Sequence, residues 1–388
     1  MTKQEKFDGV ERVGFFCTSP SWGGLEINIL RLAGWLTRRG LPVTILARAN
    51  TPLHREATGK GLGTVSVTQH RKYFDFRAAA LTAALLKKSG ITVMFVFHRN
   101  DTDVAAWTRF FAGRRIRLVY QQQMRLGVSR RDPVHALRYR AFDAWIAPLD
   151  YLRNEVLALT TVPERKIHVI PLGIDCEHYR ETGATNAGAR KFFGLGEGST
   201  IFGIIGRIEP GKGQAFLVRA LDTLRGRGRR AELLVVGDVT IEPGRPQPGR
   251  GHTGELRDLV SSLGLQDAVR IHPFVQDSRL FYRAVDAFVM ATPEETYGMV
   301  TLEAMASGVP VIGTDSTGTR EILERGRLGL LYPPADQEGF LRQAETVIAG
   351  RYSDGMLRAA RETVRERYSH SRECAMIIDL VDRLRAGA

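Results

Sequence analysis

Short apolar runs alternate with amphipathic stretches along most of this chain. Val13–Cys17 is an apolar run of strand length, and Leu25–Thr37 behind it repeats apolar residues at helical spacing. Four more runs of strand length follow in the first half of the chain: Val43–Ala47, Thr92–Phe97, Arg117–Gln121 and Ala144–Ala147. This alternation predicts βαβ units built around a mostly parallel, buried sheet.

The pattern pauses between Pro171 and Gly198, where the chain is polar and rich in glycine, and such a pause is typical of a domain boundary. A second series of strand-length runs follows: Thr200–Ile205, Glu232–Val236, Val269–His272, Ala287–Ala291 and Val309–Gly313. Residues 336–386 predict three helices, and the proline- and glycine-rich residues 240–252 predict a surface loop.

We therefore predict an α/β protein with two Rossmann-like, doubly wound domains that face a central cleft. The predicted first domain is 1–175 and the second is 176–370, while residues 371–388 form a C-terminal helix that packs back on the first domain. Ligands of open α/β sheets bind beyond the carboxyl ends of the strands. Functional residues are therefore expected directly after the strands.

The composition is that of an ordinary globular protein. Of 388 residues, 43% are hydrophobic and 25% are charged, which excludes disordered, collagen-like and coiled-coil chains, and the length suits two domains. Three widely separated cysteines form no disulfide or metal-binding pattern, and the first residues lack the apolar core of a signal peptide. We therefore expect a reducing, cytoplasmic location. The longest helix-like apolar run, Ala78–Leu86, is too short to span a bilayer.

The net charge of +13 comes entirely from the first half of the chain. Residues 1–175 hold 27 Lys and Arg against 14 Asp and Glu, whereas residues 176–388 hold 28 of each kind. This asymmetry indicates that the first domain meets an anionic partner. The charge would suit a basic nucleic-acid-binding protein, but no nucleic-acid-binding module is evident, so we do not expect nucleic acid as a partner.

Residues 105–117 combine three aromatic residues, Trp107, Phe110 and Phe111, with four arginines. Such a segment can be an interfacial helix that makes peripheral contact with an anionic membrane. It can also be a helix that connects two strands, with its aromatic residues in the core and its arginines in solvent. The second interpretation is the more usual one, and we favour it.

Two glycines follow the first predicted strand. Gly23 and Gly24 directly precede the helix predicted at Leu25–Thr37. Without side chains they would let the backbone approach a phosphate group at the start of that helix. A tight turn without any ligand explains them equally well.

The second domain opens with the segment FGIIGRIEPGKG. Its stretch Gly206–Gly213 nearly matches a P-loop, but Gly213 stands where a Ser or Thr should bind magnesium. Arg207 and Lys212 lie in this strand-end loop, from which they could neutralise a diphosphate. Two solvated charges beside a turn are the alternative.

The most informative segment is Met290–Gly318. A predicted strand ends in it, Glu295 lies in the following loop, and Gly298 precedes a predicted helix that carries Glu303. The amides of a helix start suit a phosphate, and carboxylates on either side suit the hydroxyl groups of a sugar. The neighbouring Glu294 is better explained as a solvated or helix-capping charge.

These motifs resemble those of the retaining glycosyltransferases of family 4, which have the two-domain GT-B fold. The resemblance covers nearly the whole chain. It rests on the following residues: Gly23-Gly24-Leu25-Glu26, Gly206-Arg207, Lys212-Gly213, Gly237-Asp238, and Glu295 and Glu303 with the AMASGVPVI that follows them. The spacing of the two glutamates together with that last sequence is highly specific, whereas the glycine pair alone is not.

The resemblance implies a nucleotide-sugar site in the second domain. Arg207 and Lys212 would stabilise the leaving diphosphate, Glu295 would hold the hydroxyl groups of the donor sugar, and Glu303 would bind the ribose. The distal phosphate would be capped by three backbone amides, those of Gly298, Met299 and Val300. The nucleobase site would be lined by Gly237, Asp238, Phe274 and Val275. Gly23 and Gly24 would close on the donor from the first domain.

The chain departs from the family in the first domain. The family usually has a histidine at the end of the strand that is Arg117–Gln121 here, and Gln122 or Gln123 stands in that place. Glutamine cannot act as a general base, although its amide can hold a hydroxyl or carbonyl group. His98 ends the preceding predicted strand, where it either contacts substrate or has its polar atoms satisfied within the fold. We keep these three residues as catalytic candidates.

The resemblance implies transfer of a hexosyl group from a UDP- or GDP-linked sugar with retention at the anomeric carbon. No metal ion and no cofactor are expected. Because the first domain carries the whole positive excess, we expect an anionic acceptor: a cell-envelope glycan or a lipid-linked acceptor in polysaccharide biosynthesis. The alternatives are a GT-B epimerase that acts on a sugar nucleotide and a basic nucleic-acid-binding protein.

Overall fold

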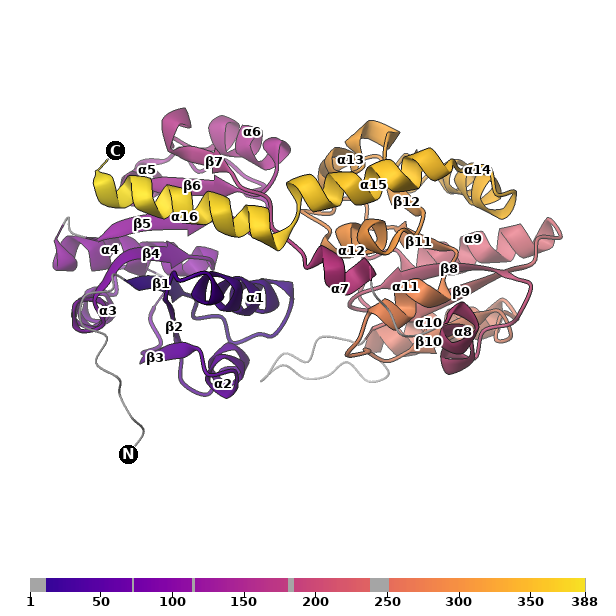
Figure 1. The fold of residues 1–388 in the computed structure, drawn as a ribbon, viewed down its shortest axis with the longest axis horizontal. Coiled ribbons are helices and arrows are strands. Elements are labelled where there is room, and N and C mark those ends of the chain that lie inside the picture. Colours follow the sequence, from indigo (N-terminus) through magenta and orange to yellow (C-terminus); the bar gives the residue numbers. More distant parts are fainter. Residues whose placement is uncertain (1–11, 72, 114–115, 181–184, 238–250, 388) are drawn as a thin grey trace. The chain divides into compact units, whose positions relative to one another are not determined.

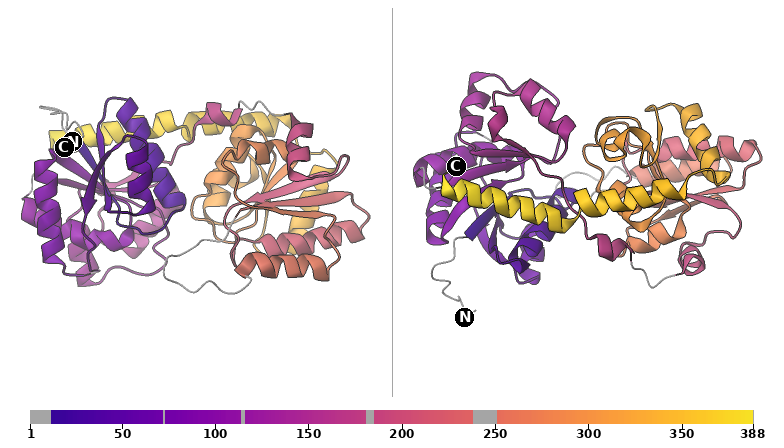
Figure 2. Two further views of the ribbon diagram at one scale, coloured as in Figure 1. Left: turned by 90° about the horizontal axis from the view of Figure 1, so that it is seen from below. Right: turned by 45° about the horizontal axis from the view of Figure 1, so that its top comes forward.

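The computed structural model describes residues 12–71, 73–113, 116–180, 185–237 and 251–387. It divides into two compact units, the first formed by Met1–Leu172 with His370–Ala388 and the second by Gly173–Ser369. Each unit is a parallel β-sheet with helices on both faces (Figure 1, Figure 2). The division falls three residues before the boundary predicted from the sequence, and the chain returns to unit 1 at His370.

Unit 1 contains a seven-stranded parallel sheet in the order β3-β2-β1-β4-β5-β6-β7. Its strands are β1 (Arg12–Phe16), β2 (Val43–Arg48), β3 (Gly63–Val67), β4 (Ile91–Val96), β5 (Arg117–Gln121), β6 (Ala144–Ala147) and β7 (Ile167–Val169). The strand order reverses between β1 and β4. In such sheets the crevice beyond the carboxyl ends of those two strands is the usual ligand site.

The helices of unit 1 are α1 (Gly24–Arg38), α2 (Pro52–Gly59), α3 (Phe76–Lys88), α4 (Thr102–Ala112), α5 (Pro133–Arg140), α6 (Asp150–Leu159) and α16 (His370–Ala386). Helices α1, α2 and α16 share one hydrophobic core with the strands. Helix α16 contributes apolar residues at helical spacing, among them Cys374, Ile377 and Val381, and Figure 1 shows it in yellow along unit 1. Helices α3 and α4 pack on each other and on β4.

Unit 2 contains a six-stranded parallel sheet in the order β10-β9-β8-β11-β12-β13. Its strands are β8 (Thr200–Ile205), β9 (Ala231–Val236), β10 (Val269–His272), β11 (Ala287–Met290), β12 (Val311–Thr314) and β13 (Leu330–Tyr332). Its helices are α7 (Cys176–Arg180), α8 (Asn186–Phe193), α9 (Gln214–Gly226), α10 (Gly251–Ser262), α11 (Arg279–Ala284), α12 (Met299–Ser307), α13 (Thr317–Ile322), α14 (Gln337–Ile348) and α15 (Asp354–Arg367). Here the order reverses between β8 and β11, so the loops after these two strands flank the expected ligand crevice.

Every strand predicted from the sequence overlaps an observed one, and the three helices expected after residue 336 are α14, α15 and α16. The strands without a prediction, β3, β7 and β13, all lie at an edge of their sheet. Two of them have only three residues, and β3 is largely exposed. An edge strand needs fewer buried positions than a central one, so its apolar pattern is weak.

The polar stretch 171–198, in which we predicted the domain boundary, contains the division between the two units, which falls after Leu172. The stretch forms α7 and α8, and α8 is closed by regular caps: Thr185 accepts from the Gly188 amide, and Gly194 ends the helix at φ +66°. Arg190 of α8 makes two hydrogen bonds to the carboxylate of Asp286, which attaches the helix to the sheet. The predicted loop 240–252 lies mostly outside the described residues.

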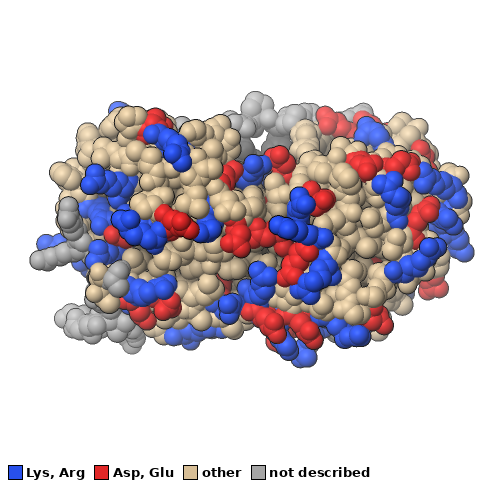
Figure 3. Space-filling view, turned by 90° about the horizontal axis from the view of Figure 1, so that it is seen from above, with Lys and Arg blue, Asp and Glu red and all other residues tan. Residues whose placement is uncertain are grey.

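The charge asymmetry follows the two units. Counted over the whole sequence, unit 1 has 30 Lys and Arg against 16 Asp and Glu, while unit 2 has 25 against 26. On the face shown in Figure 3, charges of both signs are interspersed and do not form one large patch. Within the described part of the chain, no helix is both long and apolar enough to cross a membrane.

Candidate active site

The ends of β8 and β9 approach each other at two glycines that the sequence analysis selected separately. Gly206 and Gly237 both have positive φ angles, +145° and +153°, and a Cβ on Gly237 would lie 1.8 Å from the carbonyl oxygen of Gly206. Their amides continue the sheet ladder, because Gly206 donates to Val236 and Gly237 donates to His272. Only glycine fits this approach, and it leaves the carboxyl edge of the sheet free of side chains there.

The loops after β8 and β11 meet through Lys212 and Glu295. The Nζ atom of Lys212 donates to Oε2 of Glu295 over 3.1 Å, and both side chains are partly exposed. Gly213 makes this contact possible, because its φ is +88° and a Cβ on it would lie 2.5 Å from Cβ of Ala291. The glycine that replaces the Ser or Thr of a P-loop therefore serves the packing of two strand-end loops.

The backbone of Glu295 is fixed by the turn that follows β12. Its carbonyl oxygen accepts from the amide of Gly318 at 3.1 Å and from the hydroxyl of Thr317 at 2.9 Å. A Cβ on Gly318 would lie 2.7 Å from the carbonyl oxygen of Thr296. The sequence analysis assigned no role to Thr317 or Gly318, although both lie in the segment that it found most informative.

Helix α12 begins directly beside Glu295. Gly298 precedes the helix at φ +86°, and a Cβ there would lie 3.3 Å from Cγ of Glu295 and 3.2 Å from the hydroxyl of Thr301. The first N–H groups of a helix, here those of Met299 and Val300, have no acceptor inside the helix. Together with the helix dipole they favour an anion at this end.

Glu303 is buried one turn into α12, with 6% of its surface exposed. The hydroxyl of Tyr282, on α11, lies 3.0 Å from its Oε2 atom and 3.1 Å from the carbonyl oxygen of Val300. Tyr282 therefore orients Glu303 and braces the first turn of α12. Sequence reasoning missed this tyrosine because it lies between two predicted strands, in a helix of only six residues.

The remaining candidates of unit 2, which are Arg207, Asp238, Phe274 and Val275, differ in their surroundings. Arg207 is more than half exposed and forms an ion pair with Glu209 at 3.3 Å. After β10, Phe274 is 64% exposed and Val275 is buried, so only the phenylalanine ring is accessible to a ligand. Asp238 lies outside the described residues.

Gly23 and Gly24 lie at the start of α1 in unit 1. Gly23 has an extended backbone, and neither glycine has the positive φ that would require glycine for conformational reasons. A Cβ on Gly24 would meet nothing within 4 Å. The absence of side chains at Gly23 and Gly24 therefore leaves open space beside the start of α1.

Of the two candidate glutamines, Gln122 has a structural role. It is fully buried, its Oε1 accepts from the indole N–H of Trp145 at 3.0 Å, and its Nε2 donates to the Met124 carbonyl oxygen at 3.0 Å. Both ends of its amide are thus engaged inside unit 1, and a catalytic role for Gln122 stays a prediction. Gln123 is half-buried, and its Nε2 has no hydrogen-bond partner among the described residues.

A buried carboxylate that sequence reasoning overlooked lies where the strand order of unit 1 reverses. Asp101 is fully buried, and its Oδ2 accepts from the amide of Thr18 at 2.8 Å. Its Oδ1 accepts from the Thr18 hydroxyl at 2.5 Å and from Nε2 of His70 at 2.9 Å. The Nδ1 atom of His98 lies 3.6 Å from the same oxygen. The loops after β1, β3 and β4 therefore converge on Asp101.

The pKa values of His70 and Asp101 are both shifted in the direction that favours their charged forms. Burial disfavours the Asp101 carboxylate, but the interactions with His70, His98 and Thr18 keep its pKa below the ordinary value. Burial also disfavours protonation of His70, yet the hydrogen bonds to Asp101 and to the Arg71 carbonyl raise its pKa. The two ring nitrogens of His70 face oxygen atoms of Asp101 and Arg71, an arrangement that a doubly protonated ring satisfies at both ends.

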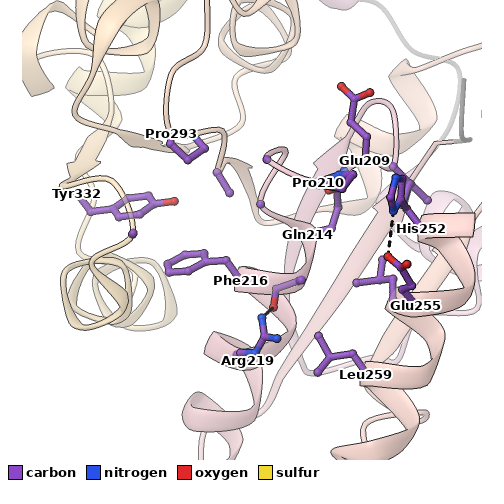
Figure 4. Close-up of a pocket in the computed structure, with 17 residues that line it drawn as sticks. Glu209, Pro210, Gln214, Phe216, Arg219, His252, Glu255, Leu259, Pro293 and Tyr332 are labelled. Atoms are coloured by element: carbon purple, nitrogen blue, oxygen red, sulfur yellow. Dashed lines mark hydrogen bonds and ion pairs between the residues drawn. The ribbon is translucent and has the colours of Figure 1, made fainter.

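Figure 4 shows a cavity of about 460 Å³ beside the Glu209–Gly213 loop of unit 2. Tyr332 and Phe216 line one side with nearly parallel rings, and His252 lies 3.0 Å from Glu255 on the other. The candidate residues Arg207, Lys212, Glu295 and Glu303 do not line this cavity. A diphosphate requires cations, so the edge formed by Lys212 and α12 suits it better. Among the described residues, no group of three His, Cys, Asp or Glu could hold a metal ion.

Two family models match the chain, one in each unit. The model described as Glycosyltransferase Family 4 matches residues 22–178, and the model described as Glycosyl transferases group 1 matches residues 199–349. The chain is similar to D-inositol 3-phosphate glycosyltransferase from Nocardia farcinica, with 35% identity over 46% of this chain and 39% of that protein. It is also similar to mannosylfructose-phosphate synthase from Agrobacterium fabrum, with 32% identity over 52% of this chain and 44% of that one. The matched stretches thus span less than half the length of these relatives.

The fold is shared with solved structures over nearly its whole length. A glycosyltransferase from Rickettsia africae superposes with a TM-score of 0.83 at 20% identity, over 96% of this chain and 98% of that one. The two family models together cover most of both units, and three of the residues that carry the resemblance, Lys212, Glu295 and Glu303, lie at or beside α12. The chain belongs to the family 4 glycosyltransferases and has their GT-B fold.

Proposed function

We propose that this protein transfers a hexosyl group from a UDP- or GDP-linked sugar to an anionic acceptor, with retention at the anomeric carbon. The observation that carries the proposal is the contact between Lys212 and Glu295 beside the start of α12. It brings together a cation suited to a diphosphate oxygen and a carboxylate suited to a sugar hydroxyl. These are the groups on the two sides of the bond that the reaction breaks.

The proposed chemistry is electrostatic. When the anomeric C–O bond breaks, negative charge develops on the leaving diphosphate. Lys212, Arg207 and the first amides of α12 stabilise that charge more strongly in the transition state than in the ground state, which lowers the barrier. Glu295 holds the sugar, and Glu303, oriented by Tyr282, binds the ribose. In this scheme fixed cations take the place of a metal ion.

Retention is proposed from the family resemblance. The acceptor attacks the face from which the diphosphate leaves, and the leaving phosphate accepts the acceptor proton. Gln123 and His98 would contact the reacting groups from unit 1, and neither is required to remove a proton in this scheme. The amide of Gln123 suits a hydroxyl group of the donor or acceptor.

The acceptor is proposed from the charge of unit 1. That unit holds 30 basic against 16 acidic residues, and such an excess attracts anions. D-inositol 3-phosphate glycosyltransferase, a relative at 35% identity, is named for a phosphorylated acceptor. We propose a phosphorylated or lipid-linked glycan, used in the cytoplasm or at the inner face of the membrane. The three free cysteines suit that reducing compartment.

The test is release of nucleotide diphosphate from a panel of UDP- and GDP-sugars, with and without phosphorylated acceptors. We expect Lys212→Ala and Glu295→Ala to abolish release, while Glu294→Ala, which removes the adjacent exposed carboxylate, stays close to wild type. Acceptor-independent conversion of the donor into another sugar nucleotide would instead show an epimerase. Full turnover in both Lys212→Ala and Glu295→Ala would exclude the proposed site.

A further inference from the structure

Exposed aromatic side chains cover one side of α3 and α4 in unit 1. Together with the half-buried Trp107 we call them the aromatic patch, and its exposed members are Tyr73, Phe74, Phe76, Phe110 and Phe111. Phe110 is 72% exposed and Phe74 is 58% exposed. Single exposed apolar residues are common in soluble proteins, but a contiguous group of large rings marks an interaction surface.

The rings of the aromatic patch are continuous. The ring centroids of Phe76 and Trp107 lie 4.8 Å apart, which joins the start of α3 to the middle of α4. Phe110 lies 6.1 Å from Trp107 and 5.6 Å from Phe111, and Phe74 lies 6.4 Å from Phe76. The patch is therefore one surface made by two helices and the turn before α3.

Helix α4 connects β4 and β5, as in the interpretation that we favoured for residues 105–117, but the burial of its side chains differs from that interpretation. Phe110 and Phe111 are exposed, whereas Arg109 is partly buried and makes hydrogen bonds to both carboxylate oxygens of Asp143. The buried face of α4 is formed by smaller residues such as Ala105 and Thr108. Two further arginines of the segment, Arg114 and Arg115, lie outside the described residues.

The turn before α3 displays its aromatic residues at a conformational cost. Phe74 has φ +53°, a left-handed conformation that is rare for a bulky residue, and its amide donates to Oδ2 of Asp103 at 2.8 Å. Asp103 is buried and paired with Arg138, whose guanidinium lies 5.3 Å from the centre of the Tyr73 ring. Strain that is held in place by buried polar contacts is typical of functional segments.

The exposed charges of α3 and α4 are all positive, whereas the partly exposed carboxylate of Asp75, between Phe74 and Phe76, caps the start of α3. The other exposed residues of α3 are apolar or basic: Arg77, Ala80, Leu81, Ala84, Lys87 and Lys88. The only carboxylate within Phe76–Lys88 and Thr102–Ala112 is that of Asp103, which is buried. A helix face in contact with water alone usually carries acidic residues as well. Rings flanked by cations complement a bilayer with anionic headgroups.

We propose that the aromatic patch is a docking surface for an anionic lipid bilayer. The rings would enter the boundary between headgroups and acyl chains, while Arg77, Lys87 and Lys88 contact the headgroups. Helices α3 and α4 start after β3 and β4, so the Phe74 turn lies at the same edge of the sheet as His98 and Asp101. Docking would therefore bring this edge of the sheet, where we propose that the acceptor binds, to the lipid surface.

The proposal is tested by co-sedimentation of the full chain with vesicles of phosphatidylglycerol or phosphatidylcholine, without donor or acceptor. We expect binding to phosphatidylglycerol that weakens with salt and a much smaller bound fraction on phosphatidylcholine. Phe110→Ser combined with Phe111→Ser should weaken binding on the order of tenfold or more. The matched control is Phe192→Ser, which removes an equally exposed ring from unit 2. Equal binding of the patch variant and wild type would overturn the proposal.

A second variant separates docking from folding. Because glycine adopts a positive φ without strain, Phe74→Gly should keep the thermal midpoint of wild type while it lowers vesicle binding. A lower midpoint with unchanged vesicle binding would show that Phe74 only supports the fold. A wild-type dimer that the Phe110→Ser, Phe111→Ser variant dissociates, with no change on vesicles, would assign the patch to a second copy of the chain. None of these assays involves turnover, so their failure would leave the proposed reaction untouched.

Discussion

Lys212 and Glu295 form a hydrogen-bonded ion pair of 3.1 Å although 83 residues separate them in the chain. They follow β8 and β11, the two strands between which the sheet order of unit 2 reverses. The pair is partly exposed, so it contributes at most about 1 kcal/mol to stability. The position of the pair at the start of α12 suits a role in ligand binding better than a role in folding.

Replacing the two partners should separate phosphate binding from sugar binding. If Lys212 binds the diphosphate as proposed, Lys212→Ala removes a charge-assisted hydrogen bond, and we expect UDP or GDP to bind about 10- to 100-fold more weakly by calorimetry. Glu295→Gln should leave nucleotide binding within a few-fold of wild type and abolish transfer. Nucleotide affinity that is unchanged in Lys212→Ala would place the diphosphate elsewhere.

Two glycines in the loop that carries Lys212 allow the cost of backbone strain to be measured separately from the cost of steric overlap. Gly211 and Gly213 both have φ +88°, but a Cβ on Gly211 meets nothing within 4 Å, while one on Gly213 overlaps Ala291. We expect Gly211→Ala to lower the free energy of unfolding by about 1 kcal/mol and Gly213→Ala by about 3 kcal/mol. Urea denaturation of both variants measures the difference. Equal losses would show that the contact with Ala291 costs nothing.

The hydroxyl of Tyr282 is expected to act through Glu303. Tyr282→Phe removes a hydrogen bond of 3.0 Å and should cost about 1 kcal/mol of stability. It should also raise KM for the donor by about three- to tenfold with little change in kcat, because a ribose contact is made in both ground and transition states. Tyr179→Phe is the matched control in the same unit. A change in stability without any change in KM would make Tyr282 a purely structural residue.

The cluster around Asp101 predicts a pH dependence of stability. The raised pKa of His70 means that the native state binds its proton more tightly than the unfolded chain does. The stabilisation is therefore fully present below pH 6.5 and is lost as the pH rises through the higher native pKa. The lowered pKa of Asp101 acts oppositely, since its stabilisation is present above pH 3.8 and is lost as the pH falls through the lower native pKa.

The measurement is urea unfolding between pH 6 and pH 9 for wild type and His70→Gln. We expect the free energy of unfolding of wild type to fall across the lower part of this range, by at most about 1.4 kcal/mol per pH unit, and the variant to lack that contribution. An identical pH profile for the two proteins would contradict a charged His70.

The architecture was predictable because central strands of parallel sheets must be apolar on both faces. All the predicted strands overlap observed ones, whereas the edge strands β3, β7 and β13 carry too few buried residues to stand out. Helices α7 and α8, which lie in the polar stretch 171–198, were not predicted for a related reason. Helix α8 is held by capping and by the Arg190–Asp286 ion pair, and these leave little apolar pattern.

The sequence by itself indicated the family and selected candidate residues of the nucleotide-sugar site, because Gly206, Gly298, Glu295 and Glu303 lie at fixed spacings within single strand–loop–helix units. Tertiary structure alone decided which distant groups meet. It brought Tyr282 to Glu303, turned Gln122 into a buried partner of Trp145, and gathered Thr18, His70 and His98 around Asp101. It also placed Phe110 in solvent and paired Arg109 with Asp143. Helical periodicity shows which residues share one face of a helix, but the elements that pack against that face decide whether those residues are buried.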